Sequence, residues 1–249
     1  MSTLSVIILT GNESRNITDC VASVRGADEV VVVDDESSDD TVELATRAGA
    51  KVIRHKLDNF ADQRNFALTQ TTGEWVFFLD ADERFSPGLM DSIRAHMDNR
   101  QGMAGSVVRR NFAFGQRHRF GPLKPDRVTR LFPAGTVYWD GLVHERPVFE
   151  INSAHLHGHL EHLTYSTWDQ YINKQLRYAD LWAREKHAVG KITSPLSAVV
   201  RGSLGFFKMF ILNMGLLGGP VAWALCSYHS LYTMTKYLKL AELNKRDGR

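Results

Sequence analysis

The feature that most constrains the fold is an alternation of apolar, strand-like runs with helix-like segments between Leu4 and Asp98. The segments between the runs repeat apolar residues about once per helical turn, as at Ile17, Val21 and Val24. Such alternation is typical of a parallel sheet with helices on both faces. An α/β domain is therefore predicted, with strands of sequence LSVIILT, EVVVVDD, KVIRH and EWVFFLD.

Length and composition limit the chemistry that the chain can use. The chain has 249 residues, which is enough for one α/β domain and an appendage. Its 43% hydrophobic and 23% charged content excludes a largely disordered chain. Cys20 and Cys226 lie far apart in the sequence, so neither a disulfide framework nor a cysteine-based metal site is predicted. The chemistry must come from other side chains.

Carboxylates follow two of the predicted strands at the point where each strand ends. Asp34 and Asp35 end the second strand, and Asp80 and Asp82 end the fourth. Ligands of open α/β sheets bind outside these carboxyl ends. Paired carboxylates there suit Mg²⁺ or Mn²⁺ beside a diphosphate. The alternative for Asp80-Ala81-Asp82 is a solvated turn before a helix that Ser86 would cap.

Four motifs occur in a fixed order between residues 3 and 98. TGNES follows the first strand, VVDDESSDDT ends the second, ADQRNFAL precedes the fourth, and FLDADE ends it. Together these motifs resemble the family 2 glycosyltransferases, which have the GT-A fold. The resemblance implies transfer of a sugar from a nucleotide diphosphate sugar with inversion, usually with a divalent metal, Mg²⁺ or Mn²⁺.

The same resemblance assigns roles to individual residues. Asp35 would accept a hydrogen bond from the uracil ring, and Arg64 would offer its guanidinium to carbonyl or phosphate oxygens. The alternative for Arg64 is a surface charge on a helix. Asp82 is expected to ligate the metal, with Asp80 as a second ligand. The expected nucleotide-binding residues are Thr10, Asn12, Asp34, Asp35, Arg64 and Asp80.

An inverting transfer also needs a base that takes the proton of the acceptor hydroxyl. Residues 138–145 combine aromatic rings, a glycine and a His-Glu pair, and RLFPAGTVYWDGLVHERP resembles the acceptor-side stretch of this family. We expect Glu145 to be the base. Asp140 is the second candidate, and its alternative role is a turn residue before Gly141.

Four histidines lie close together between residues 155 and 162. His155, His157 and His159 alternate along a predicted strand and His162 lies beyond them. We interpret them as strand histidines rather than a zinc site, with His157 or His162 helping to hold the diphosphate or metal. The residues expected on the acceptor or phosphate side are Arg130, Trp139, His144, His157 and His162.

The basic stretch has seven Lys and Arg residues and one acid between residues 109 and 130. It is read as a solvated surface, or as a site for acceptor phosphates or anionic lipid headgroups. Residues 1–200 have 23 Lys and Arg against 26 Asp and Glu, and they contain no DNA- or RNA-binding module. Nucleic acid is therefore not an expected partner.

The tail is unusually apolar. The 27 residues between Lys208 and Lys236 carry no charge, and about 20 apolar residues span a bilayer. Gly218-Gly219-Pro220 would break a spanning helix, so two shorter helices at a membrane interface are predicted for residues 195–240. The alternatives are packing on the catalytic domain or a homodimer seam, because the tail glycines permit close helix contact.

These observations predict how the chain is organised. Residues 1–165 are expected to form the GT-A catalytic domain. Its nucleotide-binding half is residues 1–98, and its loop-rich acceptor-side half is residues 99–165, with short strands such as GSVVRRNFAF and VTRLF. Residues 166–249 are expected to form a helical, membrane-associating extension.

A narrower resemblance concerns the acceptor. HERP, the histidine-rich strand, LTYSTWDQYINKQLRYADLWA and the tail resemble bacterial lipopolysaccharide core glucosyltransferases that form a β-1,4 linkage to heptose. This implies transfer of a hexose, with UDP-glucose favoured as donor, at the cytoplasmic face of the inner membrane. The alternatives are another cell-envelope glycan or glycolipid acceptor, a sugar-nucleotide nucleotidyltransferase, and a non-catalytic sugar-nucleotide sensor.

Overall fold

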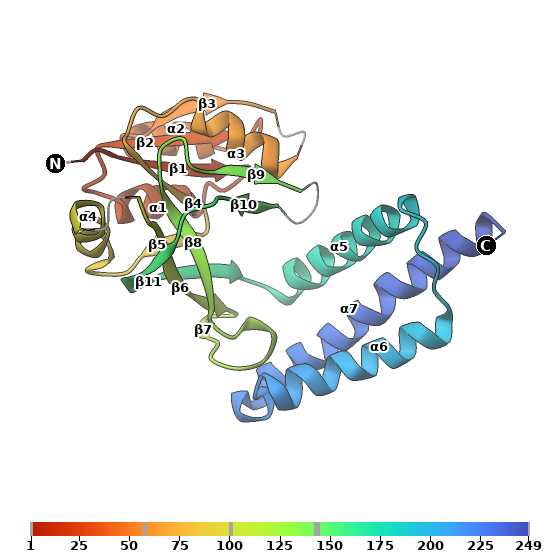
Figure 1. The fold of residues 1–249 in the computed structure, drawn as a ribbon. Coiled ribbons are helices and arrows are strands. Elements are labelled where there is room, and N and C mark those ends of the chain that lie inside the picture. The colour runs from red at the N-terminus through yellow and green to blue at the C-terminus, as the bar shows by residue number, and fades with distance from the viewer. Residues whose placement is uncertain (1, 57–58, 100–101, 142–144, 249) are drawn as a thin grey trace. The chain divides into compact units, whose positions relative to one another are not determined.

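The computed structural model describes residues 2–56, 59–99, 102–141 and 145–248 (Figure 1). The chain packs as two compact units: unit 1 is Met1–Arg109 with Asp126–Leu163, and unit 2 is Arg110–Pro125 with Thr164–Arg249. By sequence, unit 1 has 14 Lys and Arg against 23 Asp and Glu, and unit 2 has 16 against five. Their formal charges are therefore −9 and +11. The predicted domain boundaries stay a prediction, because compact packing does not test independent folding.

The parallel part of the sheet confirms the four predicted strands. They are β1 (Leu4–Thr10), β2 (Glu29–Asp34), β3 (Lys51–Arg54) and β4 (Trp75–Asp80). Their order is β3-β2-β1-β4, so the chain moves outward from β1 and then returns to its other side. Ligands of open α/β sheets bind where the strand order reverses in this way. The connecting helices are α1 (Ile17–Ser23), α2 (Thr41–Arg47) and α3 (Phe60–Leu68).

Antiparallel strands continue the sheet beyond β4. The order there is β4-β8-β6-β11-β5, and β7 pairs with β6. The second half of the chain is therefore richer in strands than the predicted loops suggested, because its glycines and prolines lie mainly in the turns. The strands are β5 (Glu83–Phe85), β6 (Ala104–Ala113), β7 (Gln116–Arg117), β8 (Asp126–Pro133) and β11 (Ser153–Tyr165), with a separate hairpin of β9 (Tyr138–Asp140) and β10 (Arg146–Val148).

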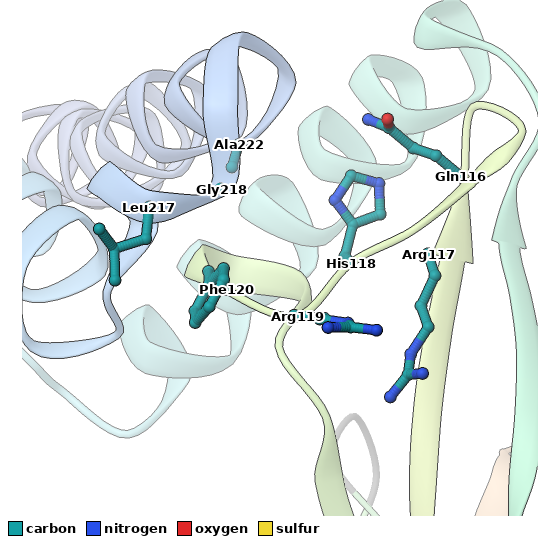
Figure 2. Close-up of a pocket in the computed structure, with 8 residues that line it drawn as sticks. All are labelled: Gln116, Arg117, His118, Arg119, Phe120, Leu217, Gly218 and Ala222. Atoms are coloured by element: carbon teal, nitrogen blue, oxygen red, sulfur yellow. The ribbon is translucent and has the colours of Figure 1, made fainter.

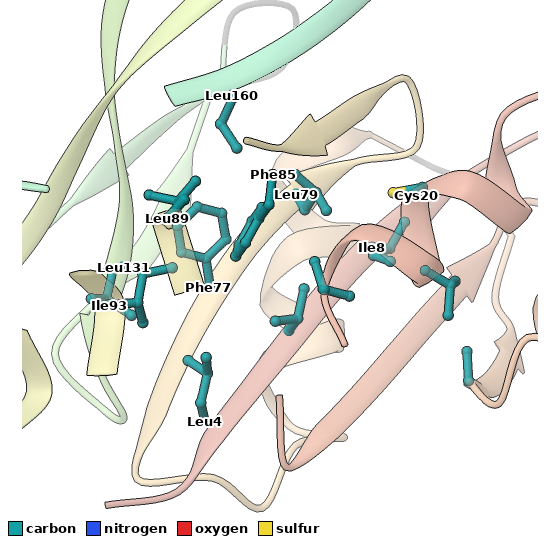
Figure 3. Packing of buried hydrophobic residues seen from close by; sticks show 14 of the residues in the cluster. Leu4, Ile8, Cys20, Phe77, Leu79, Phe85, Leu89, Ile93, Leu131 and Leu160 are labelled. Atoms are coloured by element: carbon teal, nitrogen blue, oxygen red, sulfur yellow. The ribbon is translucent and has the colours of Figure 1, made fainter. Parts of the chain in front are cut away.

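Apolar side chains cover both faces of this sheet. Leu4, Val6 and Ile8 of β1 pack in one cluster, part of which Figure 3 shows, whereas Ile7 and Leu9 pack in another. Alternate residues of a strand point to opposite faces, so β1 is buried on both sides. Helix α4 (Leu89–Asn99) contributes its buried apolar side chains to the first cluster. The core thereby fixes the strand ends that position the site.

Unit 2 contains three long helices, α5 (Trp168–Ala188), α6 (Pro195–Phe207) and α7 (Gly219–Arg246). A π-helical turn, Lys208–Leu212, and the 3₁₀ turn Gly215–Gly218 connect α6 to α7. The predicted break at the Gly-Gly-Pro sequence is confirmed, and Gly219 has a φ of +74° there. Helix α7 is longer than predicted, with 28 residues, because its C-terminal half packs on α5 through Leu240 and Trp182.

One stretch of the described residues, Pro195–Leu212, is long and apolar enough to cross a membrane, with a mean hydropathy of 1.3. It begins before the predicted uncharged gap and contains Arg201 and Lys208. Only 11% of it is buried within the protein. Helix α6 therefore presents an apolar surface outward, while its inner face packs on α7 at Gly202.

Candidate functional site

The loops after β1 and β2 are tied together by hydrogen bonds. Asp34 is fully buried, and its carboxylate accepts from the Ser37 backbone N–H at 2.9 Å and from the Ser37 hydroxyl. Ser37 Oγ in turn accepts from the Asn12 N–H at 2.8 Å. Asp34 therefore holds the loops, while half-buried Asp35 lies next to it at the edge of the sheet. Thr10 lies beside Asp34 in the strand register.

Two buried arginines flank Asp80 at the end of β4. Arg64 Nη2 lies 2.8 Å from Oδ1 of Asp80, and Arg130 Nη2 lies 2.7 Å from Oδ2. Burial by itself would raise the pKa of the Asp80 carboxyl, but the charges of Arg130 and Arg64 outweigh it and hold the pKa well below its usual range. The structure thus brings Arg130, which was expected on the acceptor side, to the same carboxylate as Arg64.

Glu83 completes this network, and sequence reasoning missed it. Its buried carboxylate lies 3.2 Å from Arg130 and 3.5 Å from Arg109, and it accepts the Asp80 backbone N–H at 3.1 Å. Burial raises the pKa of Glu83 against the opposing charge of Arg130. The last residue of the FLDADE motif was the available signal, because it follows the two aspartates directly.

Trp139 and Glu145 both contact Arg64. The Trp139 ring lies 4.5 Å from the guanidinium carbon, and Asn65 of α3 holds the Trp139 backbone with hydrogen bonds of 2.8 and 2.9 Å. A Glu145 oxygen lies 3.5 Å from Arg64 Nη2, and its side chain is 20% exposed. Asp140 is exposed in β9, opposite Arg146 of β10. The geometry therefore places Glu145, and not Asp140, in the network around Asp80.

Asp82 contacts a histidine, whereas Asp80 contacts the two arginines. Its Oδ2 lies 3.3 Å from Nε2 of His162 on β11, and the two side chains are 21% and 15% exposed. The strand placement of the predicted histidines is confirmed, but exposed His157 lies beside the His155 ring, with ring centroids 6.4 Å apart, and its backbone N–H donates to Ser92 Oγ at 2.8 Å. His144 lies outside the described residues.

No group of three or more His, Cys, Asp and Glu side chains with metal-binding geometry occurs in the described ranges. The predicted metal ligand Asp82 lies close enough to His162 for both side chains to contact one ion. Asp80 is engaged by the arginines instead, so the structure does not bring the two aspartates together on a common partner.

Several buried polar atoms in this region have no protein partner. Arg64 retains Nε and Nη1, and Arg130 retains Nε, with no hydrogen-bond acceptor among the described residues. The Thr10 hydroxyl and Trp139 Nε1 are likewise buried without a hydrogen-bond partner among the described residues. Buried polar groups are almost always satisfied, so these leftover donors single out this edge of the sheet as the candidate ligand-binding region.

Comparison with solved structures gives matches of low similarity. Glucosyl-3-phosphoglycerate synthase from Mycobacterium tuberculosis, in a complex with Mn²⁺, UDP and glucosyl-3-phosphoglycerate, is 23% identical, with a TM-score of 0.37. The match covers 46% of this chain and 45% of that one. Mannosyl-3-phosphoglycerate synthase from Rubrobacter xylanophilus is 22% identical, with a TM-score of 0.37 over 45% of this chain and 40% of that one.

Sequence relatives cover far more of the chain. An uncharacterized glycosyltransferase of Rickettsia prowazekii is 28% identical over 98% of this chain and 87% of its own length. The lipopolysaccharide core biosynthesis glycosyltransferase LpsC of Rhizobium meliloti is 27% identical over 84% of this chain and 81% of its own length. The family model described as glycosyl transferase family 2 matches residues 5–146, which include the network around Asp80. The chain therefore belongs to glycosyl transferase family 2 and has the mixed α/β GT-A fold.

Proposed function

We propose that this protein transfers a hexose from a UDP-sugar, with UDP-glucose favoured, to a membrane-associated glycan such as the lipopolysaccharide inner core. The observation that carries the proposal is the group of arginine nitrogens without an acceptor beside Asp80 at the end of β4, with the Glu145 carboxylate 3.5 Å from Arg64. These donors suit the negative oxygens of a nucleotide diphosphate. The similarity to the Rhizobium meliloti core glycosyltransferase supports the acceptor class.

The nucleoside part of the donor would lie against the loops after β1 and β2. Asp35 would accept the uracil N3–H, and Thr10 and Asn12 would line the base and ribose. Asp34 serves this surface indirectly, because its hydrogen bonds to Ser37 fix the backbone that carries Asn12. Arg64 and Arg130 would face the diphosphate, while Asp80 holds both guanidinium groups in place.

The residues present fit a divalent cation. Asp82 and His162 supply one oxygen and one nitrogen 3.3 Å apart, a separation at which both can contact a single Mg²⁺ or Mn²⁺. When bound, such an ion would neutralise charge on the departing diphosphate. The remaining ligands would come from the donor and water, because Mg²⁺ in phosphate sites is usually bound by substrate phosphates and several waters.

Glu145 would act as the base. As the acceptor oxygen forms its bond to the anomeric carbon, the bond from that carbon to the diphosphate oxygen breaks, and Glu145 takes the hydroxyl proton. UDP leaves, and the new linkage has inverted configuration. Arg64 positions the Glu145 carboxylate, and the Trp139 ring fixes the Arg64 guanidinium from the other side.

The apolar surface of unit 2 would place the enzyme at the cytoplasmic face of the inner membrane, where a growing glycolipid is presented. Leu204 and Phe207 of α6 are 62% and 60% exposed, which is costly in water and favourable in a lipid interface.

Product analysis with labelled UDP-sugars tests the proposal. Purified protein is incubated with UDP-glucose, UDP-galactose or UDP-N-acetylglucosamine and core oligosaccharide, in Mn²⁺ and in chelator. We expect sugar transfer and UDP release that require the cation, with Glu145→Gln as the inactive control. Pyrophosphate release would indicate a nucleotidyltransferase, and binding without turnover for every donor would indicate a sensor.

A further inference from the structure

We propose that unit 2 contains a binding site for the phosphate headgroup of an anionic phospholipid, located between the loop of residues 116–120 and the start of α7. This inference rests on the proposed membrane contact and names the group that the protein would hold there. Figure 2 shows the pocket, which encloses about 180 Å³. Its lining includes Arg117, His118, Arg119, Phe120, Leu217 and Ala222.

The basic loop is fixed to the turn between α6 and α7. The Gly121 N–H donates to the Asn213 carbonyl at 2.9 Å, and Lys124 Nζ donates to Asn213 Oδ1 at 2.9 Å. Gly121 approaches the turn so closely that a Cβ there would lie 3.7 Å from Gly215 Cα, and its φ of +73° favours glycine. Arg117 and Arg119 are therefore held beside the turn by hydrogen bonds at two points.

The turn itself is apolar and exposed. Leu212, Leu216 and Leu217 are 74%, 50% and 61% exposed. Trp223, which is 45% exposed, donates its indole N–H to the Leu216 carbonyl at 2.9 Å. Exposed leucines beside a tryptophan are typical of protein segments that lie at the boundary between lipid headgroups and acyl chains. Arginines next to such a turn would lie at headgroup depth.

The charge around the pocket favours a lipid surface over a second copy of this chain. No Asp or Glu occurs in residues 110–125 or 189–241, so these segments carry the positive charges of Lys and Arg and no acidic side chain. Two copies meeting through this turn would bring like charges together, which is unfavourable. Anionic headgroups would instead neutralise the arginines while the leucines enter the lipid.

The positive charge of the pocket comes from its arginines. Burial lowers the pKa of His118, whose Nε2 lies 3.2 Å from the Ala113 carbonyl oxygen, and this favours the neutral ring. Arg117 and Arg119 are exposed and carry guanidinium groups, which match a phosphate with two parallel N–H donors. A lysine in the same place would keep the charge but lose this geometry.

Charge-conserving variants of the full-length protein separate a headgroup site from general attraction to a charged surface. Arg119→Lys changes a pocket residue, and Lys208→Arg is the matched control, because Lys208 is also exposed near the turn but does not line the pocket. Binding is measured by sedimentation with phosphatidylcholine vesicles that contain or lack phosphatidylglycerol. UDP binding and the thermal unfolding midpoint are followed in parallel, and both should stay at the wild-type values.

We expect Arg119→Lys to bind anionic vesicles about 5- to 10-fold more weakly than wild type, and Lys208→Arg to bind within about 2-fold. Soluble sn-glycerol 3-phosphate should compete with vesicles for wild type and compete poorly for Arg119→Lys. Equal binding by both variants would overturn the site, since only the surface charge would then matter. The headgroup site would also be overturned if the wild-type protein did not bind anionic vesicles, or if its turn were buried in a stable dimer.

The vesicle assay does not depend on sugar transfer. Loss of transfer with intact vesicle binding would refute the proposed catalytic function and leave the headgroup site standing. The opposite result would refute the headgroup site alone.

Discussion

Asp80 and Asp82 lie two residues apart in one motif, yet they have different neighbours, so we expect different consequences from replacing each by asparagine. Asp80→Asn removes the charge between Arg64 and Arg130, whose side chains are only 5% and 6% exposed. Removing one partner of a buried ion pair typically destabilises by about 3 to 5 kcal/mol. Asp80 is 28% exposed and each arginine keeps a second carboxylate, so we expect the lower end, about 3 kcal/mol.

Thermal unfolding followed by circular dichroism measures this difference. A loss of 3 kcal/mol corresponds to a decrease of about 6 to 12 °C in the midpoint for a protein of this size. Asp82→Asn gives up one histidine contact at 3.3 Å, so its midpoint should fall by less than about 2 °C. Asp82→Asn should instead have its main effect on turnover. It removes an expected cation ligand and should lower kcat by about 10²-fold in a folded protein.

The pH dependence provides a second check on Asp80. Its pKa is lowered in the folded state, so its contribution to stability is fully present above the unfolded value, about 3.9, and is lost as the pH falls through the folded value. The midpoint difference between wild type and Asp80→Asn should therefore be steady above about pH 5 and shrink below about pH 4. Equal midpoints for the two variants at pH 7, or full activity of Asp82→Asn in chelator, would refute the assigned roles.

Two further comparisons test other parts of the chain. Glu145→Gln should retain UDP binding and lose about 10² to 10⁴-fold in kcat, whereas Asp140→Asn should stay within about 2-fold; the reverse ranking would transfer the role of base to Asp140. Gly205→Ala should raise the stability of the α6–α7 pair by about 0.5 to 1 kcal/mol, because alanine has the higher helix propensity and its Cβ would meet Thr233 Oγ1 at an unstrained 3.5 Å. Gly202→Ala should lower it by about 1 to 3 kcal/mol, because its Cβ would lie 2.2 Å from Met234 Cγ, and a urea titration in which both variants gain stability would contradict this packing.

The sequence predicted the parallel half of the fold because that half is built from local patterns. The strands β1 to β4 have apolar centres bounded by polar residues, and carboxylates follow at the ends of β2 and β4. The resemblance to family 2 glycosyltransferases, carried by the same motifs, is confirmed by the family match over residues 5–146. The predicted site residues remain predictions, and the structure places Glu145 3.5 Å from Arg64.

The arginine pair around Asp80 could not be predicted in the same way. Arg130 reaches Asp80 from 50 positions later in the chain, because β8 pairs antiparallel with β4 and no local pattern encodes that pairing. The burial of Glu83 depends on the same long-range contact. In the tail, the glycine and proline residues marked the break between helices correctly. The candidate span was missed, because Arg201 and Lys208 interrupt its apolar pattern.

The division of charge between the two units gives ionic strength two opposite effects on this protein. Near physiological salt the Debye length is about 8 Å, so an approaching ligand responds mainly to the unit that it meets. For the proposed donor, a nucleotide diphosphate, the net charge of −9 on unit 1 would oppose approach, and added monovalent salt should therefore speed its association. An anionic membrane approaching unit 2, with its charge of +11, meets attraction, which the same salt weakens. Under the proposed function, a rise in ionic strength would therefore weaken membrane binding and speed donor association.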